Sequence, residues 1–292
     1  MSEHFSGRAP GAALYVVATP IGNLGDLTLR ALDVLRAAEL VACEDTRHSA
    51  RLLQHYGIAA QCIAVHEHNE RAASARLVQA VAEGKVVALI TDAGTPGWSD
   101  PGARVVRSLQ EAGLPVVPLP GPCAAVAALS AGGLLDARFL FAGFLPARGQ
   151  ARRGQIESLR DIDAALVFYE APHRIAECVA DLASLLEPER ELLIARELSK
   201  TFEQIVRLPL AQAPQWLAAD AMRQRGEFVL AVSAPPRRAG AALDAHATRT
   251  LGVLLADLPL KQAVKLAAEL TGAPRNALYE HALAQAAQQS ED

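Results

Sequence analysis

The sequence lacks a hydrophobic run long enough to cross a membrane. Its longest apolar stretches have about the length of a strand and are interrupted, whereas a membrane-spanning helix needs about 20 predominantly apolar residues. The first residues, MSEHFSGRAPG, carry an acid and have no apolar segment of the signal-peptide kind. We therefore expect a loose leader over residues 1–12, no membrane partner and a cytoplasmic protein.

Cysteine is scarce, and basic charge is not in excess. The four cysteines, Cys43, Cys62, Cys123 and Cys178, are widely spaced and form no CxxC pair, which is typical of buried thiols in a reducing compartment. The formal net charge is −4, so no global positive field indicates a nucleic-acid partner. A local basic face is still allowed, because attraction to phosphates depends on the nearby charges.

Two nucleotide-binding fingerprints are also missing. No GxGxxG motif follows an expected strand, and Gly84-Lys85 is not followed by the Ser or Thr of a P-loop. An ordinary dinucleotide-binding or NTP-binding enzyme is therefore disfavoured. The segment His66-Glu67-His68 does not have the HExxH spacing and has no third ligand nearby, so we expect no metal site.

What the sequence does contain is a regular alternation of strands and helices. Strands are expected at 14–18, 40–43, 61–65, 86–90 and 116–119, with helices over 28–38, 46–55, 69–84, 103–111 and 123–130. This rhythm predicts crossover connections and a mostly parallel sheet. We assign residues 13–133 to this first α/β domain.

The second half predicts another α/β domain and a helical end. Residues 134–235 would form a mixed sheet from strands over 139–144, 165–169, 192–195, 204–208 and 227–232, with a helix over 214–223. The segment APPRRAG, residues 234–240, is typical of a linker. Residues 241–292 would form a small unit of three helices, near 242–256, 260–270 and 274–285, that resembles a helix-turn-helix in outline. The predicted fold class is therefore α/β, with two α/β domains and a small C-terminal helical unit.

The most informative segment is the loop TDAGTPGWSDPG, residues 91–102. It follows the buried strand expected at 86–90, and its glycines and prolines exclude helix and regular strand. The loops 19–26 and 120–122 follow two other strands of the same sheet. Open α/β sheets bind ligands at the carboxyl ends of their strands, so three such loops on one edge predict a small-molecule site.

Polar side chains gather at further strand ends. The segment 44–47, EDTR, joins a strand to a helix. At least one of its two acids suits the helix N-terminus, and the other acid and the arginine could face the predicted small-molecule site. Glu170, His173 and Arg174 look too polar for a core. A short basic run, which is either a solvated helix face or a phosphate-contacting surface, consists of Arg148, Arg152 and Arg153.

These segments occur together, and in order, in a known family. The matching stretches are TPIGNLGDLTLRA (19–31), CEDTR (43–47), HEHNE (66–70), TDAGTPGWSDPG (91–102), PGPCA (120–124), FAGFLP (141–146), YEAPHR (169–174) and GEFVL (226–230). From about Leu14 to Val232 the chain resembles the tetrapyrrole methylase family. Within that family it is similar to the bacterial methyltransferases that modify a cytidine ribose 2′-oxygen in the decoding region of small-subunit ribosomal RNA. It departs from their pattern at Trp98, where a plain aliphatic residue is usual, and at Cys123, where Ser is frequent.

The resemblance implies a fold of tetrapyrrole-methylase type, with S-adenosylmethionine in the cleft between the two α/β domains, and a homodimer. The residues that it implies for the cofactor are Asp92, Ala93, Gly94, Gly121, Pro122, Cys123 and Ala124 in the first domain, and Phe144, Leu145, Tyr169, Glu170, Glu227, Phe228 and Val229 in the second. Glycine-rich turns offer N–H donors to a carboxylate, and apolar strand walls suit an adenine ring.

The reaction so implied is an in-line methyl transfer to a ribose 2′-hydroxyl of small-subunit ribosomal RNA, as free RNA or within the assembled subunit. Candidate catalytic bases are Asp100, Glu170 and Asp45, and the predicted RNA contacts are Arg47, Arg148, Arg152, Arg153, Lys261 and Lys265.

Two alternatives remain open at this point. One is a methyltransferase of the same fold that acts on a tetrapyrrole or another small molecule. The other is a non-enzymatic nucleic-acid-binding regulator built around the tail, which would leave the strand-end loops unexplained.

Overall fold

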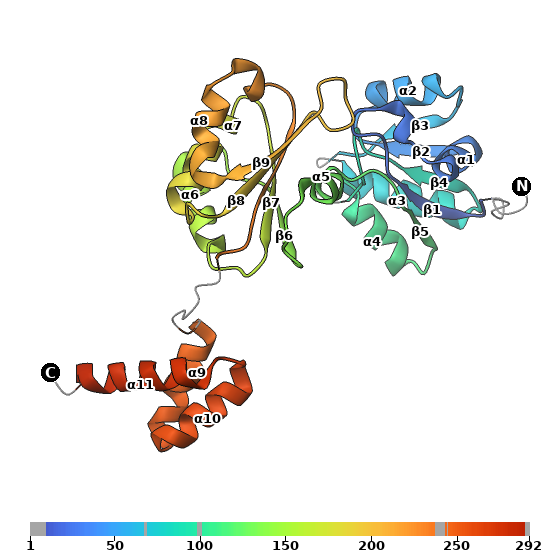
Figure 1. Ribbon diagram of the computed structural model, residues 1–292. Coiled ribbons are helices and arrows are strands. Elements are labelled where there is room, and N and C mark those ends of the chain that lie inside the picture. Colours follow the sequence, from blue (N-terminus) through green and yellow to red (C-terminus); the bar gives the residue numbers. More distant parts are fainter. Residues whose placement is uncertain (1–9, 67–68, 98–100, 237–242, 244, 290–292) are drawn as a thin grey trace, which may run out of the picture. The chain divides into compact units, whose positions relative to one another are not determined.

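The chain folds into two compact units, Met1–Pro235 and Pro236–Asp292. The structure, a computed structural model, describes residues 10–66, 69–97, 101–236, 243 and 245–289 (Figure 1). Asp100 and Trp98, which the sequence singles out, lie outside these described residues.

The first unit opens with a parallel sheet in the strand order β3-β2-β4-β1-β5. Its strands are β1 (Ala13–Val17), β2 (Leu40–Cys43), β3 (Gln61–Ala64), β4 (Val86–Leu89) and β5 (Val116–Leu119). Between them run the 3-10 turn η1 (Leu24–Asp26) and the helices α1 (Leu29–Ala37), α2 (Thr46–His55), α3 (Glu70–Ala82) and α4 (Ala103–Glu111). The mostly parallel sheet expected from the sequence is confirmed.

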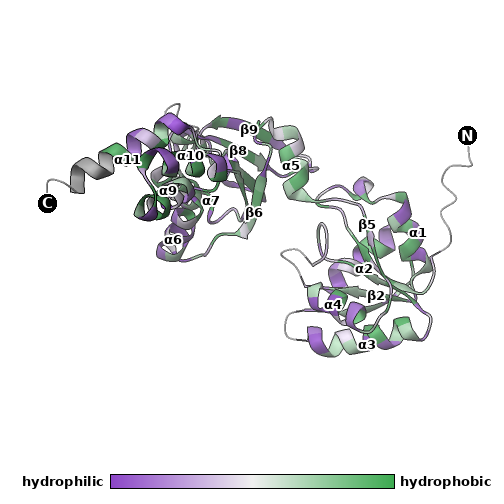
Figure 2. Ribbon diagram, turned by 90° about the horizontal axis from the view of Figure 1, so that it is seen from below, coloured by the Kyte–Doolittle hydropathy of each residue, from purple (hydrophilic) through white to green (hydrophobic). Residues whose placement is uncertain are grey.

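Helices cover both faces of this sheet, and β1 shows why. Its side chains alternate, so Tyr15 and Val17 pack with α1 and α2, whereas Leu14 packs on the opposite face with α3 and α4. Strands that are covered on both faces are apolar throughout, as β2 and β4 are. Figure 2 shows green, hydrophobic ribbon in the strands and purple, hydrophilic stretches on the helices around them.

A second sheet follows, in the order β6-β7-β10-β8-β9. Its strands are β6 (Phe139–Phe144), β7 (Ala165–Glu170), β8 (Glu191–Arg196), β9 (Gln204–Pro209) and β10 (Phe228–Val232). Strand β6 is parallel to β7, and the other neighbouring strands are antiparallel, so the predicted mixture of directions is confirmed. One face is covered by α6 (Gly149–Leu159), α7 (Ile175–Leu185) and α8 (Ala213–Ala218), with the 3-10 turns η2 (Leu210–Gln212) and η3 (Ala221–Gln224) nearby in the chain.

Helix α5 (Ala124–Gly132) covers the other face of the second sheet (Figure 1). Ala125 and Ala128 are buried there against Val167, Leu193 and Val229. The sequence places this helix in the first domain, and its packing links the two sheets instead. The division of the unit at residue 133 stays a prediction.

One helix prediction was wrong. The helix expected over 214–223 is interrupted, because α8 ends at Ala218 and the Asp220 carboxylate accepts a hydrogen bond of 2.8 Å from the Met222 N–H. Asp220 therefore caps the start of the 3-10 turn η3 and does not continue helix α8.

The second unit consists of α9 (Ala245–Asp257), α10 (Leu260–Thr271) and α11 (Arg275–Gln289). It has its own hydrophobic core, to which each helix contributes, among others, Leu251, Ala263 and Leu278. In the described ranges of the whole chain, every helix is too short or too polar to cross a membrane.

Candidate functional site

Three loops meet at the carboxyl edge of the first sheet. Thr19 and Gly94 exchange backbone hydrogen bonds of 2.9 and 3.1 Å, and the Thr19 hydroxyl donates to the Thr91 carbonyl at 3.0 Å. The Thr95 hydroxyl donates to the Pro122 carbonyl, also at 3.0 Å. The convergence expected of the strand-end loops is thereby confirmed for their described residues.

The turn between β5 and α5 brings its backbone close to β1. A side chain at Gly121 would place its Cβ 2.7 Å from the Cβ of Ala18, so this approach requires glycine. Helix α5 begins at Ala124, and within the described part of the chain the Cys123 side chain makes no capping hydrogen bond there. Because N–H groups at the start of a helix favour an anion, this turn can receive a carboxylate.

An aromatic wall from the second sheet flanks the same turn. The Ala125 N–H donates to the Tyr169 hydroxyl at 3.2 Å, which joins the end of β7 to the start of α5. Phe141 and Phe144 meet the Tyr169 ring edge to face, with centroids 4.8 and 5.8 Å away. The wall offers the apolar surface on which a planar ring can lie.

A bulge in β6 builds this wall. Two residues three apart on a regular strand face opposite sides, but the register of β6 against β7 shifts between Phe141 and Gly143, where Gly143 has a φ of +66°. The shift brings Phe141 and Phe144 to one side. Phe141 is not among the cofactor residues that the family resemblance implies, and the glycine within FAGF is the sequence signal that could have indicated the bulge beside it.

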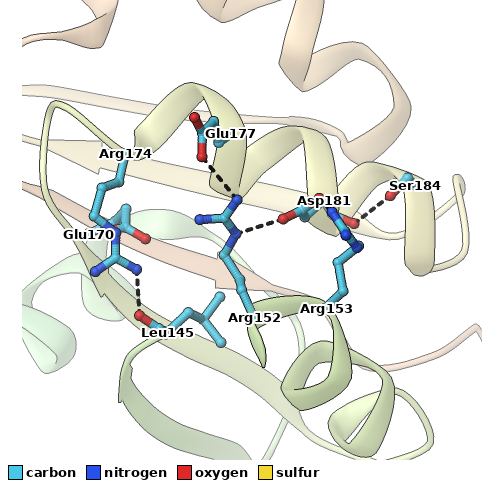
Figure 3. Close-up of polar contacts among 8 residues, drawn as sticks. All are labelled: Leu145, Arg152, Arg153, Glu170, Arg174, Glu177, Asp181 and Ser184. Carbon is cyan, nitrogen blue, oxygen red and sulfur yellow. Dashed lines mark hydrogen bonds and ion pairs between the residues drawn. The ribbon is translucent and has the colours of Figure 1, made fainter. Parts of the chain in front are cut away.

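Glu170 is buried, with its side chain 0% exposed. Its carboxylate forms an ion pair of 3.2 Å with Arg174 and accepts from the Ala171 N–H at 2.9 Å. Arg174 also donates to the Leu145 carbonyl just after β6 (Figure 3). The expectation that Glu170 is too polar for a core was therefore wrong, because Arg174 compensates its charge there. Because the carboxylate is buried and paired in this conformation, its position does not support Glu170 as the base, and that role stays a prediction.

Backbone groups hold two more of the predicted acids. The Asp45 carboxylate accepts from the N–H groups of Arg47 and His48 at 2.7 and 3.4 Å and so caps α2. The backbone hydrogen bond from Arg47, and then that residue's side chain, lower the pKa of Asp45 below its ordinary value, which makes it a weaker base. The Asp92 carboxylate accepts from the Asp45 N–H at 3.3 Å. Ala93 beside it is exposed in the loop.

The remaining predicted cofactor residues of the second sheet divide between its two faces. Leu145 and Phe228 contribute their side chains to the core under α7, so only their backbone can face the α5 side. Glu227 is exposed and forms an ion pair of 2.7 Å with Lys200. The side chains on the α5 side are those of Phe144, Tyr169 and Val229.

Arg152 is a buried structural residue. Its side chain is 4% exposed and forms ion pairs of 2.6 and 3.2 Å with Asp181 and Glu177 of α7 (Figure 3). The prediction that it contacts RNA is corrected, because its charge is enclosed and already paired. Arg153 is half exposed, although it also reaches Asp181 at 3.5 Å. The exposed predicted RNA contacts of the first unit are Arg47, Arg148 and Arg153.

A pocket of about 440 Å³ lies beside the turn at Gly121. Its walls come from the loop after β1, from the turn before α5 and one side of that helix, and from the connection between β8 and β9, which contributes Leu198, Ser199 and Glu203. The Ser199 hydroxyl donates to the Asp26 carboxylate and so links two of these walls. The volume suits a small molecule. Among the described residues, no cluster of three or more His, Cys, Asp or Glu side chains could hold a metal ion.

The predicted pocket members are Gly121, Pro122 and Cys123. The residues from the β8–β9 connection were missed as members of this site. Their signal in the sequence is a run of polar side chains, Arg196, Glu197, Ser199, Lys200 and Glu203. The run reaches this pocket only because the two sheets pack beside each other, which the sequence does not show.

Comparison with known proteins divides the chain into the same two units that the structure shows. Residues 13–214 match the family described as tetrapyrrole (corrin/porphyrin) methylases, and residues 241–286 match the RsmI C-terminal HTH domain. The chain is 52% identical to the ribosomal RNA small subunit methyltransferase I of Pseudomonas aeruginosa, covering 92% of this chain and 96% of that protein. It is 47% identical to the protein of the same name from Escherichia coli O157:H7, covering 98% and 99%.

Solved structures with the same fold include the uroporphyrin-III-C-methyltransferase of Thermus thermophilus, which is 25% identical, with a TM-score of 0.54 over 76% of this chain and 94% of that one. A diphthine synthase, 17% identical, gives a TM-score of 0.59 over 76% and 90%. A further uroporphyrin-III C-methyltransferase structure from Thermus thermophilus, complexed with S-adenosyl homocysteine, is 21% identical, with a TM-score of 0.52 over 76% and 97%. The last two likenesses concern the fold alone.

Proposed function

Since the chain belongs to the tetrapyrrole methylase family, we propose that it is an S-adenosylmethionine-dependent methyltransferase of small-subunit ribosomal RNA. One observation carries this proposal. The likeness to curated ribosomal RNA small subunit methyltransferases I extends over nearly the whole length of both chains, tail included. The finer assignment is transfer of a methyl group in line to the 2′-oxygen of a cytidine ribose. The names of these relatives do not favour the tetrapyrrole alternative.

The cofactor assignment is supported by the fit between the described residues and the groups of the nucleoside. Backbone at Gly121 and the start of α5 would hold the carboxylate, and the wall of Phe144 and Tyr169 would lie against the adenine. Asp92, Gly94 and the Leu145 backbone belong to the same proposed set. When bound, S-adenosylmethionine supplies a methyl group on a good leaving group.

The chain's own contribution would then be mainly alignment. Holding the acceptor oxygen in line with the methyl group is worth up to roughly 7–11 kcal/mol. A base that takes the hydroxyl proton adds roughly 10²–10⁴-fold. With Glu170 buried in an ion pair and Asp45 engaged as a helix cap, Asp100 is the candidate base that we retain.

We place the RNA phosphates at the exposed cations Arg47, Arg148 and Arg153 of the first unit and at Lys261 and Lys265 of the second. A ribosomal RNA substrate is found in the cytoplasm, so we propose that location. A homodimer, as the family resemblance implies, is the assembly that we expect, and sedimentation of the full chain would test it.

The decisive experiment incubates the chain with methyl-labelled S-adenosylmethionine and, in separate reactions, naked small-subunit RNA, assembled small subunits and a tetrapyrrole. We expect label on a cytidine 2′-oxygen of the RNA, in one or both RNA-containing reactions. Label on the tetrapyrrole alone would overturn the proposed substrate. In the same assay at saturating cofactor, Asp100→Asn should slow turnover by roughly 10²–10⁴-fold; unchanged turnover would remove Asp100 as the base.

A further inference from the structure

A groove between α10 and α11 of the second unit has a composition unlike that of the unit as a whole. It has a volume of about 320 Å³ and is lined by Lys261, Val264, Lys265, Arg275, Asn276 and Tyr279. Helix α10 packs directly against α11 here. From Arg237 onward the chain has six Lys or Arg and six Asp or Glu residues, so it carries no excess of positive charge. Three of those six cations line this one groove.

Helical spacing explains why these side chains face the groove together. Lys261 and Lys265 are four residues apart on α10, so they share one face of that helix. On α11, Arg275 and Tyr279 are also four apart. Val264, which is 5% exposed, closes the floor between the two rows.

The groove's side chains are free to meet a ligand. Lys261, Lys265, Arg275 and Asn276 are exposed, and Tyr279 is 38% exposed although it neighbours the fully buried Leu278. Arg275 has an ion pair with Glu269 at 3.7 Å, but both side chains are more than half exposed. Such a surface pair is weak and can be exchanged for a phosphate.

We propose that this groove binds a nucleotide of single-stranded RNA, with the three cations on flanking phosphates, the Tyr279 ring stacked on the base and the Asn276 amide at its edge. Exposed aromatic rings beside cations are the means by which proteins hold unstacked bases. The major groove of an RNA duplex is too narrow for side chains to read, which favours a single strand. The identification of the ligand as RNA rests on the proposed function, whereas the groove is defined by the geometry of its lining residues.

The test measures binding of a fluorescent single-stranded RNA oligonucleotide to the full chain by anisotropy, over a range of salt concentrations. Tyr279→Ala should weaken binding by roughly tenfold or more, the effect of losing one base–aromatic stack, whereas Tyr279→Phe should bind as the wild type does. The triple variant Lys261→Ala/Lys265→Ala/Arg275→Ala should lower the slope of log Kd against log salt by about 2, since each phosphate contact on a single strand contributes about 0.7. Arg249→Ala removes an exposed cation of α9 outside the groove and serves as the matched control.

The proposal is overturned if the triple variant binds with the wild-type affinity and salt slope, or if Arg249→Ala weakens binding as much as each groove substitution made singly. Methyl transfer separates this failure from that of the proposed function. If the triple variant methylates RNA with the wild-type KM, the RNA-binding role of the groove is rejected and the proposed function stands. If the wild type methylates no RNA but Tyr279→Ala abolishes its binding of the oligonucleotide, the proposed function is rejected and the RNA-binding role of the groove stands.

Discussion

The Glu170–Arg174 ion pair anchors Leu145, a residue of the proposed cofactor set, although the Glu170 side chain is itself buried. Arg174→Met would leave the Glu170 carboxylate, 0% exposed, without its counter-ion, and an unpaired buried charge costs about 3–5 kcal/mol. We therefore expect the free energy of unfolding of the first unit, measured in urea, to fall by about 3 kcal/mol. Cofactor affinity, measured by calorimetry on the folded variant, should fall as well, because the Leu145 carbonyl loses its donor.

The double variant Arg174→Met/Glu170→Gln separates these two effects. It removes both charges, so most of the stability should return, while the Leu145 carbonyl still lacks its partner and cofactor binding stays weak. A double variant with normal cofactor affinity would show that Arg174 acts only on stability. Wild-type stability in the single variant would show that the ion pair contributes little.

Single residues also show how much of the site the sequence predicts. The backbone features were predictable, because Gly94 and Gly121 follow strands of one parallel sheet and such strands end at one edge. The burial of Arg152 was not, because its partner Asp181 lies 29 residues away on another helix. A charged residue is assigned to the surface by default, and only the packing of α6 on α7 reveals the exception.

Helix α2 offers a test at the level of one element, because its first turn depends on the charge of Asp45. The pKa of this carboxyl is lowered in the folded chain, first by the backbone hydrogen bond from Arg47. A group with a lowered pKa contributes stability above its unfolded-state value, and the contribution is lost as pH falls through the folded-state value. The Asp45→Asn variant keeps a capping oxygen and removes only the charge.

We expect Asp45→Asn to have a lower melting temperature than the wild type at pH 7, measured by calorimetry. The difference should shrink as pH falls below the ordinary value of 3.8, since the unfolded chain then takes up a proton that the folded carboxyl still resists. A melting-temperature difference that stays constant from pH 7 to pH 3 would mean that the charge of Asp45 does not act through this cap.

Elements were predicted best where local signals and packing agree. Helices α2 and α4 and strand β5 have the bounds expected from the sequence, because caps, glycines and apolar runs all indicate the same ends. Helix α5 follows the rhythm of the first sheet along the chain, yet its alanines pack on the second sheet. The bulge in β6 is likewise set by pairing with β7, which periodicity within one strand does not contain.

As a whole, the chain joins a unit that carries the proposed chemistry to a unit that carries a proposed RNA groove. Each has a hydrophobic core of its own. The two family matches fall on the two units in the same way, over residues 13–214 and 241–286. Cofactor binding and part of the RNA binding should therefore be separable by cutting the chain between them.

A chain ended after Pro235 tests this separation. It keeps every residue of the proposed cofactor set, so S-adenosylmethionine should bind within about twofold of the wild-type affinity, measured by calorimetry. It loses the three cations and the tyrosine of the groove, so RNA should bind roughly tenfold more weakly or worse, and methyl transfer should show a raised KM for RNA. If the shortened chain methylates RNA with an unchanged KM, the second unit does not take part in substrate binding. Lost cofactor binding in a shortened chain that is folded by circular dichroism would instead mean that the second unit supports the cofactor site.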